Sequence, residues 1–381
     1  MNRRDDRESL HPSSSHRLHS LGHLKIARGA PGGRREEPDA GATDAVLFME
    51  EGMSRSAAGD LRGAIAAWKQ ALERDPSLVE AWNSIGFANE AAGDHENAAR
   101  SFRRAIALRE DQQEAWFNLG NAEDSRGNLE DAVAAYRSAL DLQPDLFEAW
   151  NNLGNAHARL GNLEESIGCY RKALEIRPNL FESWYNLGNA FVEAKAPDAA
   201  VDAYREALRL RPDAYQVWYN LGNVFLDLGR ADESVRAYRS ALEHRRDDHE
   251  VWNNLGNALA QQGRHSEALT CYQQALQLHS TYDPSWNNLG NVLEEIGDLE
   301  AATRAYTRAV ALAPHQPTYR LNLASVLVRC GETNGAVEHL AQALGLAPDL
   351  RHLIPGFTEL EPLLKHPKLR LDQSEPRSRE P

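Results

Sequence analysis

Residues 150–183 read WNNLGNAHARLGNLEESIGCYRKALEIRPNLFES, and residues 184–217 read WYNLGNAFVEAKAPDAAVDAYREALRLRPDAYQV. Both stretches place Trp, Leu-Gly, Tyr and Pro at the same positions. The same spacing of 34 residues separates seven tryptophans, which are Trp82, Trp116, Trp150, Trp184, Trp218, Trp252 and Trp286. A fixed period of this length predicts a repeat protein, in which stacked copies of one small unit share a continuous core.

The repeat extends beyond the tryptophans in both directions. Sliding the same frame along the chain places Phe48 and Arg320 in the tryptophan position of a first and a last unit. The nine resulting units are 45–78, 79–112, 113–146, 147–180, 181–214, 215–248, 249–282, 283–316 and 317–350. We therefore expect one array of nine 34-residue repeats over residues 45–350.

Each unit contains two amphipathic stretches with a glycine between them. In the third unit this glycine is Gly127, and the stretch after it carries Ala132, Tyr136 and Ala139 at the three- and four-residue steps of one helical face. This pattern predicts an all-α fold in which each unit is a helix, a tight turn and a second helix. Small residues are expected where the two axes come closest, because a larger side chain would push the helices apart.

Residue pairs just ahead of the tryptophans suggest where each first helix begins. The pairs, each three residues apart, are Ser77 with Glu80, Asp111 with Glu114, Asp145 with Glu148, Asn179 with Glu182, and Asp247 with Glu250. This spacing predicts capping boxes, in which the first member accepts a hydrogen bond from a backbone N–H of the first turn. A proline often comes one residue earlier, where the preceding helix must already have ended.

The pattern W-x-N-L-G-N…G…A…Y…A…P over 34 residues resembles the tetratricopeptide repeat family, and the resemblance covers residues 45–350. It implies a right-handed superhelical solenoid whose concave groove is lined by the first helix of each repeat. The fifth unit departs from the pattern, since Lys195 and Pro197 stand at the turn glycine and shortly after it. We expect a local change of pitch there.

Two rows of asparagine are expected on the first helices. The first row lies two residues after the tryptophan position and consists of Asn118, Asn152, Asn186, Asn220, Asn254, Asn288 and Asn322. The second row lies three residues further on and consists of Asn121, Asn155, Asn189, Asn223, Asn257 and Asn291. An amide offers a donor and an acceptor together, which suits the peptide group of an extended chain. By resemblance to the peptide-binding arm of O-linked N-acetylglucosamine transferase, the first row would clamp a partner's backbone. Alternatively, both rows satisfy neighbouring helix ends.

Between the tryptophan and the first row, one position varies, and Phe117, Tyr185 and Tyr219 occupy it in three central units. Aromatic rings here fit a surface that selects partners, because they provide large contact area at modest entropic cost. The alternative is that the rings pack against the next unit. Six acidic residues lie later on the first helices: Glu90, Asp124, Glu193, Asp227, Glu294 and Glu295. If they face the groove, a basic or neutral segment is the expected guest.

Composition excludes several functions. The formal net charge is −14, which disfavours nucleic acid as a ligand. No apolar run approaches the roughly 18 residues of a membrane helix, so membrane insertion is not expected. Three cysteines without CxxC spacing predict neither disulfides nor a zinc site, and they favour a reducing compartment. The cysteine usage and the lack of an apolar segment favour a cytoplasmic protein. Because no nucleophile elbow, phosphate loop or HExxH motif occurs, we expect no catalytic residues, no metal and no cofactor.

The two ends of the chain differ from the array. Residues 1–44 contain four histidines, at His11, His16, His19 and His23, and are interpreted as a disordered polar tail, as are residues 372–381. The segment 351–371 is expected to cap the last repeat, using Leu353, Ile354, Phe357, Leu360, Leu363 and Leu364. The predicted function is a scaffold that binds extended segments of partner proteins. The alternative is a non-catalytic, substrate-recruiting subunit of an enzyme complex, for example with a glycosyltransferase on another chain.

Overall fold

The computed structural model describes residues 40–356 and 359–369, and every secondary-structure element in them is helical. The chain divides into two compact units, unit 1 ending at Leu210 and unit 2 beginning at Arg211. The predicted tails lie outside the described residues, except that the first helix already begins at Ala40. The all-α fold and the helix-turn-helix repeats predicted from the sequence are confirmed.

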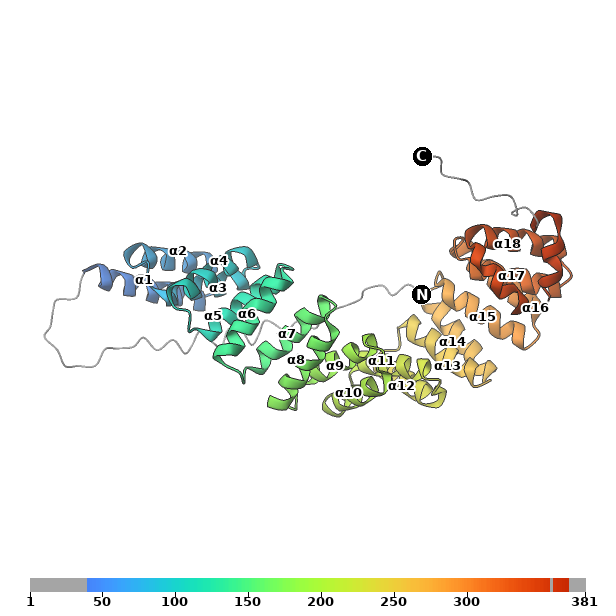
Figure 1. The fold of residues 1–381 in the computed structure, drawn as a ribbon, viewed down its shortest axis with the longest axis horizontal. Helices are drawn as coiled ribbons and strands as arrows, with labels where there is room; N and C mark the ends of the chain where they lie inside the picture. The colour runs from blue at the N-terminus through green and yellow to red at the C-terminus, as the bar shows by residue number, and fades with distance from the viewer. Residues whose placement is uncertain (1–39, 357–358, 370–381) are drawn as a thin grey trace. The chain divides into compact units, whose positions relative to one another are not determined.

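Unit 1 is a stack of five helix pairs (Figure 1). Its helices are α1 (Ala40–Ala57), α2 (Leu61–Arg74), α3 (Val79–Ala91), α4 (His95–Leu108), α5 (Gln113–Ser125), α6 (Leu129–Leu142), α7 (Phe147–Arg159), α8 (Leu163–Ile176), α9 (Phe181–Glu193) and α10 (Pro197–Leu210). Each helix packs against the next one in the chain. The first helices α5, α7 and α9 also contact one another in succession, so they share one face of the stack.

Unit 2 repeats this arrangement with four helix pairs and three short 3₁₀ helices. The elements are α11 (Tyr215–Asp227), α12 (Ala231–His244), α13 (His249–Gln261), α14 (His265–Leu278), α15 (Asp283–Glu295), α16 (Leu299–Leu312), α17 (Pro317–Arg329), α18 (Thr333–Leu346), η3 (Pro348–Gly356), η4 (Glu361–Lys365) and η5 (Pro367–Leu369). The first helices α11, α13, α15 and α17 again contact one another in succession.

A glycine of the first helix lies against an aromatic ring of the second helix in each repeat from the first to the eighth. A Cβ built on Gly154, for example, would lie 2.7 Å from Cε1 of Tyr170. The ring itself is 2% exposed. Only glycine therefore allows the two helices to approach this closely, as the recurring small residues predicted.

The turn inside each repeat depends on one residue with positive φ. Eight glycines hold this position with φ between 70° and 87°, and Lys195 holds it in the fifth repeat with φ 56°. The Lys195 and Ala196 nitrogens donate to carbonyl oxygens at 3.1 and 2.9 Å, as Gly161 and Asn162 do at 3.0 and 2.9 Å. The turn thus keeps its geometry, at the steric cost that a side chain incurs in this conformation.

The predicted capping boxes are wrong at four of the five first helices. Helices α3, α5, α7 and α9 follow Leu78, Gln112, Leu146 and Leu180, and none of these four residues makes a side-chain cap. The proposed caps lie one residue too early, inside the turn between repeats. Ser77, for instance, donates instead to Asp75 Oδ1 at 2.6 Å.

Side-chain caps occur elsewhere. In the fifth predicted box the cap is Asp248, one residue after the position expected, and it accepts from the nitrogens of Glu250 and Val251 at 2.9 and 3.3 Å. Asp60, Asp94 and Asp298 cap second helices, each accepting from the nitrogen three residues later. These second-helix caps follow the turn glycine by one residue, a position that the predicted capping boxes do not include.

The tryptophans tie each first helix to the turn before it. The indole Nε1 donates to the carbonyl oxygen six residues earlier in seven repeats, at 2.8 Å from Trp150 to Pro144 and 2.9 Å from Trp184 to Pro178. In the ninth repeat Arg320 Nε makes the equivalent bond to Pro314, at 3.1 Å. An arginine can replace the indole here because both present a planar N–H donor.

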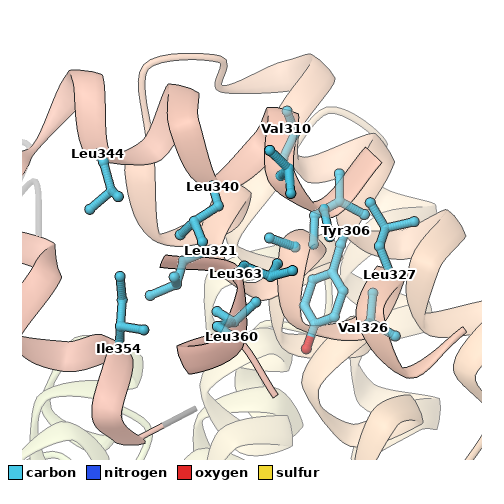
Figure 2. Close-up of a cluster of buried hydrophobic side chains, with 14 of the residues drawn as sticks. Tyr306, Val310, Leu321, Val326, Leu327, Leu340, Leu344, Ile354, Leu360 and Leu363 are labelled. Carbon is cyan, nitrogen blue, oxygen red and sulfur yellow. The ribbon is translucent and has the colours of Figure 1, made fainter. Parts of the chain in front are cut away.

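The segment after α18 covers the exposed side of the last repeat. Ile354, Leu360 and Leu363 are buried in one cluster with side chains of α17 and α18 (Figure 2). Leu369 belongs to the same cluster. Arg351 Nη2 also donates to the Leu369 carbonyl oxygen at 2.8 Å, which joins the two ends of the segment. The Leu353 side chain and Phe357, also predicted for this role, lie outside the described residues.

Replacing Gly154 with Ala should destabilise unit 1 by about 2 kcal/mol, because the added Cβ must displace the Tyr170 ring. Gly168 in α8 is the matched control, since a Cβ there meets nothing within 4 Å. Gly168→Ala should stabilise the same repeat by up to about 1 kcal/mol through helix propensity. Free energies of unfolding in urea measure both, and equal effects of the two changes would contradict the packing argument.

Replacing Lys195 with Gly should raise the free energy of unfolding by about 0.5–1 kcal/mol. Relief of the left-handed conformation exceeds the extra chain entropy that glycine brings to the unfolded state. The reciprocal change, Gly161→Lys, should lower stability by a similar amount, although a Cβ at Gly161 meets no atom within 4 Å. Thermal melting measures both variants: the melting temperature should rise in Lys195→Gly and fall in Gly161→Lys.

Candidate peptide-binding face

The second asparagine row is held by the tyrosines of the second helices. Each asparagine follows the packing glycine, and the tyrosine 15 residues later donates its hydroxyl to the asparagine Oδ1. The bonds are Tyr136 to Asn121 (2.9 Å), Tyr170 to Asn155 (2.7 Å), Tyr204 to Asn189 (2.6 Å), Tyr238 to Asn223 (2.6 Å), Tyr272 to Asn257 (2.8 Å) and Tyr306 to Asn291 (2.8 Å). The amide orientation is therefore set by a buried ring.

The first row bonds to the second row of the preceding repeat. Nδ2 donates to the same Oδ1 that accepts from tyrosine, in Asn152 to Asn121 (2.9 Å), Asn186 to Asn155 (2.9 Å), Asn254 to Asn223 (3.2 Å), Asn288 to Asn257 (2.9 Å) and Asn322 to Asn291 (3.4 Å). The two rows thus join successive first helices. We call the surface formed by both rows the amide face.

The amide face keeps unused hydrogen-bonding groups. Asn155 and Asn186 are both half-buried, and the bond between them uses one oxygen and one N–H. Within the described part of the chain, Asn155 Nδ2 donates to no group and Asn186 Oδ1 accepts from none. A donor and an acceptor therefore lie side by side on adjacent repeats, as a peptide group requires.

The residue directly before each first-row asparagine determines whether the Oδ1 of that asparagine is already hydrogen-bonded. Where it is asparagine, its Nδ2 donates to the Oδ1 of the next residue, at 3.4 Å from Asn151, 3.1 Å from Asn253 and 3.4 Å from Asn287. Phe117 and Tyr185 have no such donor, so the amide oxygens of Asn118 and Asn186 are not used in this way. Asn118 makes no side-chain hydrogen bond to any described residue, because Phe87 takes the second-row position in the repeat before it.

The three predicted aromatic residues are half-buried, and each packs against a ring of its own repeat, while the Tyr219 hydroxyl also accepts a hydrogen bond from Asn254 of the next repeat at 3.4 Å. Phe117 lies 6.0 Å from the Tyr136 ring, and Tyr185 stacks on Phe181 at 6.2 Å. Tyr219 stacks on Tyr215 at 6.5 Å, and burial raises its pKa to about 12.

Several of the predicted acidic residues form ion pairs between repeats. Asp124 pairs with Arg159 of the next first helix, and Glu294 pairs with Arg329 at 2.7 Å. Glu193 lies at the end of α9, and Asp227 lies at the end of α11. Asn220 of the first asparagine row also lies on α11. The paired carboxylates are partly neutralised by the chain itself, which lowers the negative potential that a guest would meet.

Two cysteines are buried in second helices, Cys169 in α8 and Cys271 in α14. Burial raises the pKa of the Cys169 and Cys271 thiols to about 11, so both are poor nucleophiles. In the described residues, no three His, Cys, Asp or Glu side chains gather as metal ligands would. No helix among the described residues is long and apolar enough to cross a membrane.

Sequence reasoning missed the bond from tyrosine to asparagine. Its signal was available, since Gly-Asn and Tyr recur with a constant separation of 15 residues in six repeats. The alternative prediction was that the asparagines satisfy neighbouring helix ends. The amides instead bond to tyrosines and to one another across repeats.

Comparisons with known families agree with this architecture. Residues 146–352 match the family model described as the C-terminal domain of cilia and flagella-associated protein 70. Two tetratricopeptide repeat models match residues 125–161 and 49–115. A search of curated proteins finds no match.

Several solved structures are similar to parts of the chain. YrrB, described as a TPR protein with an unusual peptide-binding site, is 22% identical with a TM-score of 0.46, over 49% of this chain and 97% of its own. A MamA structure is 25% identical with a TM-score of 0.44, over 45% of this chain and 94% of its own. PilF of Pseudomonas aeruginosa is 21% identical with a TM-score of 0.45, over 56% and 94%.

Replacing Tyr170 with Phe should cost about 1 kcal/mol of folding stability, because Asn155 Oδ1 loses one of its two donors while the ring remains. Tyr282→Phe is the control, since the Tyr282 hydroxyl bonds to no described residue. It should change stability by less than about 0.5 kcal/mol. Urea denaturation measures the free energy of unfolding of both variants. If Tyr170→Phe leaves it unchanged, the hydrogen bond from Tyr170 to Asn155 does not contribute to stability.

Proposed function

Because this chain belongs to the tetratricopeptide repeat family, whose members generally mediate protein–protein interactions, we propose that it is a scaffold that holds extended segments of partner proteins on the amide face. Repeat scaffolds of this kind are usually non-catalytic. The guest's backbone is bound by the asparagine rows, and its side chains are selected by the residues between them.

The observation that carries the proposal is the unused donor and acceptor at Asn155 and Asn186. Their mutual bond of 2.9 Å and the bond from Tyr170 fix both amides before any guest arrives. Fixed groups lose little conformational entropy on binding, so each new hydrogen bond contributes more to affinity. A peptide group can donate to Asn186 Oδ1 and accept from Asn155 Nδ2.

Selection is assigned to the half-buried rings of Phe117, Tyr185 and Tyr219. Each ring replaces an asparagine found at the same position in other repeats, and in doing so it adds apolar contact area to an amide-rich surface. A basic or neutral guest is favoured by the net charge of −14. The ion pairs of Asp124 and Glu294 moderate this preference without reversing it.

Replacing Asn155 with Asp separates binding from folding. The remaining oxygen still accepts from Tyr170 and Asn186, whereas the donor that faces the guest becomes a second acceptor. We expect a fluorescein-labelled neutral decapeptide of alternating Ser and Val to bind the variant about tenfold more weakly, through one lost hydrogen bond and repulsion of its carbonyl. Fluorescence anisotropy measures this, and the melting temperature should stay within a few degrees.

Asn179→Asp provides the matched control. Asn179 is exposed in the turn before α9, so the substitution adds the same charge away from the amide face. It should leave peptide affinity unchanged. Equal affinities of the wild type, Asn155→Asp and Asn179→Asp would contradict backbone binding at this face.

A further inference from the structure

One position near the end of each second helix carries arginine in several repeats. Arg109, Arg177, Arg211 and Arg245 stand at this position, which we call the arginine slot. Arg109 Nη2 lies 3.6 Å from Glu80 Oε1 of the first helix in the same repeat. Arg177 and Arg245 lie over the Phe147 and Tyr215 rings at 4.7 and 5.2 Å. The guanidinium therefore covers the beginning of the first helix, and in the second and fourth repeats it also lies near the glutamate of that helix's first turn.

The third repeat lacks this arginine. Gln143 stands in the slot and accepts a hydrogen bond from Gln113 Nε2 at 3.0 Å. Glu114 occupies the position that Glu80 holds in the second repeat, but no Lys, Arg or His among the described residues forms an ion pair with it. Burial raises the pKa of Glu114 with no cation to oppose it, whereas at Glu148 the raising effect of burial is opposed by Arg177.

A pocket of about 360 Å³ lies where the arginine would be. Gln113, Glu114 and Gln143 line it with amide and carboxylate groups, and Leu142 adds an apolar side chain that is 45% exposed. Asp111 at the rim is already paired with Arg109, whose Nε lies 3.8 Å from its Oδ1, so Glu114 is the carboxylate left for a guest. The combination of an apolar surface, amide oxygens and an unpaired carboxylate matches a long side chain that ends in a planar cation.

We propose that this pocket receives an arginine side chain of the bound partner segment. The guest's guanidinium takes the place that the chain's own arginine fills in neighbouring repeats: it pairs with Glu114 and donates to the Gln143 amide, while its methylene groups lie on Leu142. This inference rests on the proposed function, because it assigns one side chain of a segment whose backbone is held by the amide face.

The test compares two labelled peptides with the Ser-Val sequence, one with arginine and one with neutral citrulline at its centre. Wild-type protein should bind the arginine peptide about fivefold more tightly, as expected of one partly exposed ion pair. Gln143→Arg, which fills the pocket from within, and Glu114→Gln should each bring this ratio to about one. The control Glu130→Gln, on the exposed first turn of α6, should keep it.

A ratio of one in the wild type, or a ratio that survives in both pocket variants, overturns the assignment while leaving the scaffold function in place. If neither peptide binds, backbone binding fails instead. The pocket is then tested alone with N-acetylarginine methylamide, by NMR of protein labelled with ¹⁵N-glutamine. Shifts of the Gln113 and Gln143 side-chain amides that are absent with the citrulline analogue support the assignment, provided that the Gln113 shift is also lost in Gln143→Arg. Unshifted signals in the wild type overturn it.

Discussion

The contact between a first-helix glycine and a second-helix aromatic ring sets the geometry of each repeat in which it occurs. At Gly154 a single Cβ would come within 2.7 Å of the Tyr170 ring, so the helix spacing depends on its absence. Because the next residue is Asn155, the same approach brings the Tyr170 hydroxyl within 2.7 Å of an amide oxygen. One packing contact thus stabilises the repeat and orients the groups of the amide face.

Features that depend on one repeat alone could be predicted from the sequence. The 34-residue spacing of the tryptophans gave the helix pairs and their number, since the same apolar pattern recurs in each unit. The turn glycines and the small residues between helices could also be predicted, because each has a local steric reason. Arg320 and Lys195 depart from the pattern, yet each keeps the bond or the backbone conformation of the residue it replaces.

Features that depend on neighbouring repeats were predicted less well. The rows of asparagine were found, but their mutual bonds join residues 31 positions apart and no local pattern reveals them. The capping boxes failed because a shift of one residue moves Ser77 into the turn, where Asp75 is the nearer acceptor. The unpaired Glu114 is visible only once the arginine slot of its neighbours is known, since in the sequence it looks like every other glutamate at that position.

The central claim is that Asn155 and Asn186 present a fixed donor and acceptor to a peptide backbone. NMR of protein labelled with ¹⁵N-asparagine, titrated with the neutral Ser-Val peptide, tests it most directly. The account predicts that the Asn155 side-chain amide protons move downfield on saturation and exchange more slowly with water. Peptide binding that leaves the Asn155 signals unmoved, while signals away from the amide face shift, would contradict it.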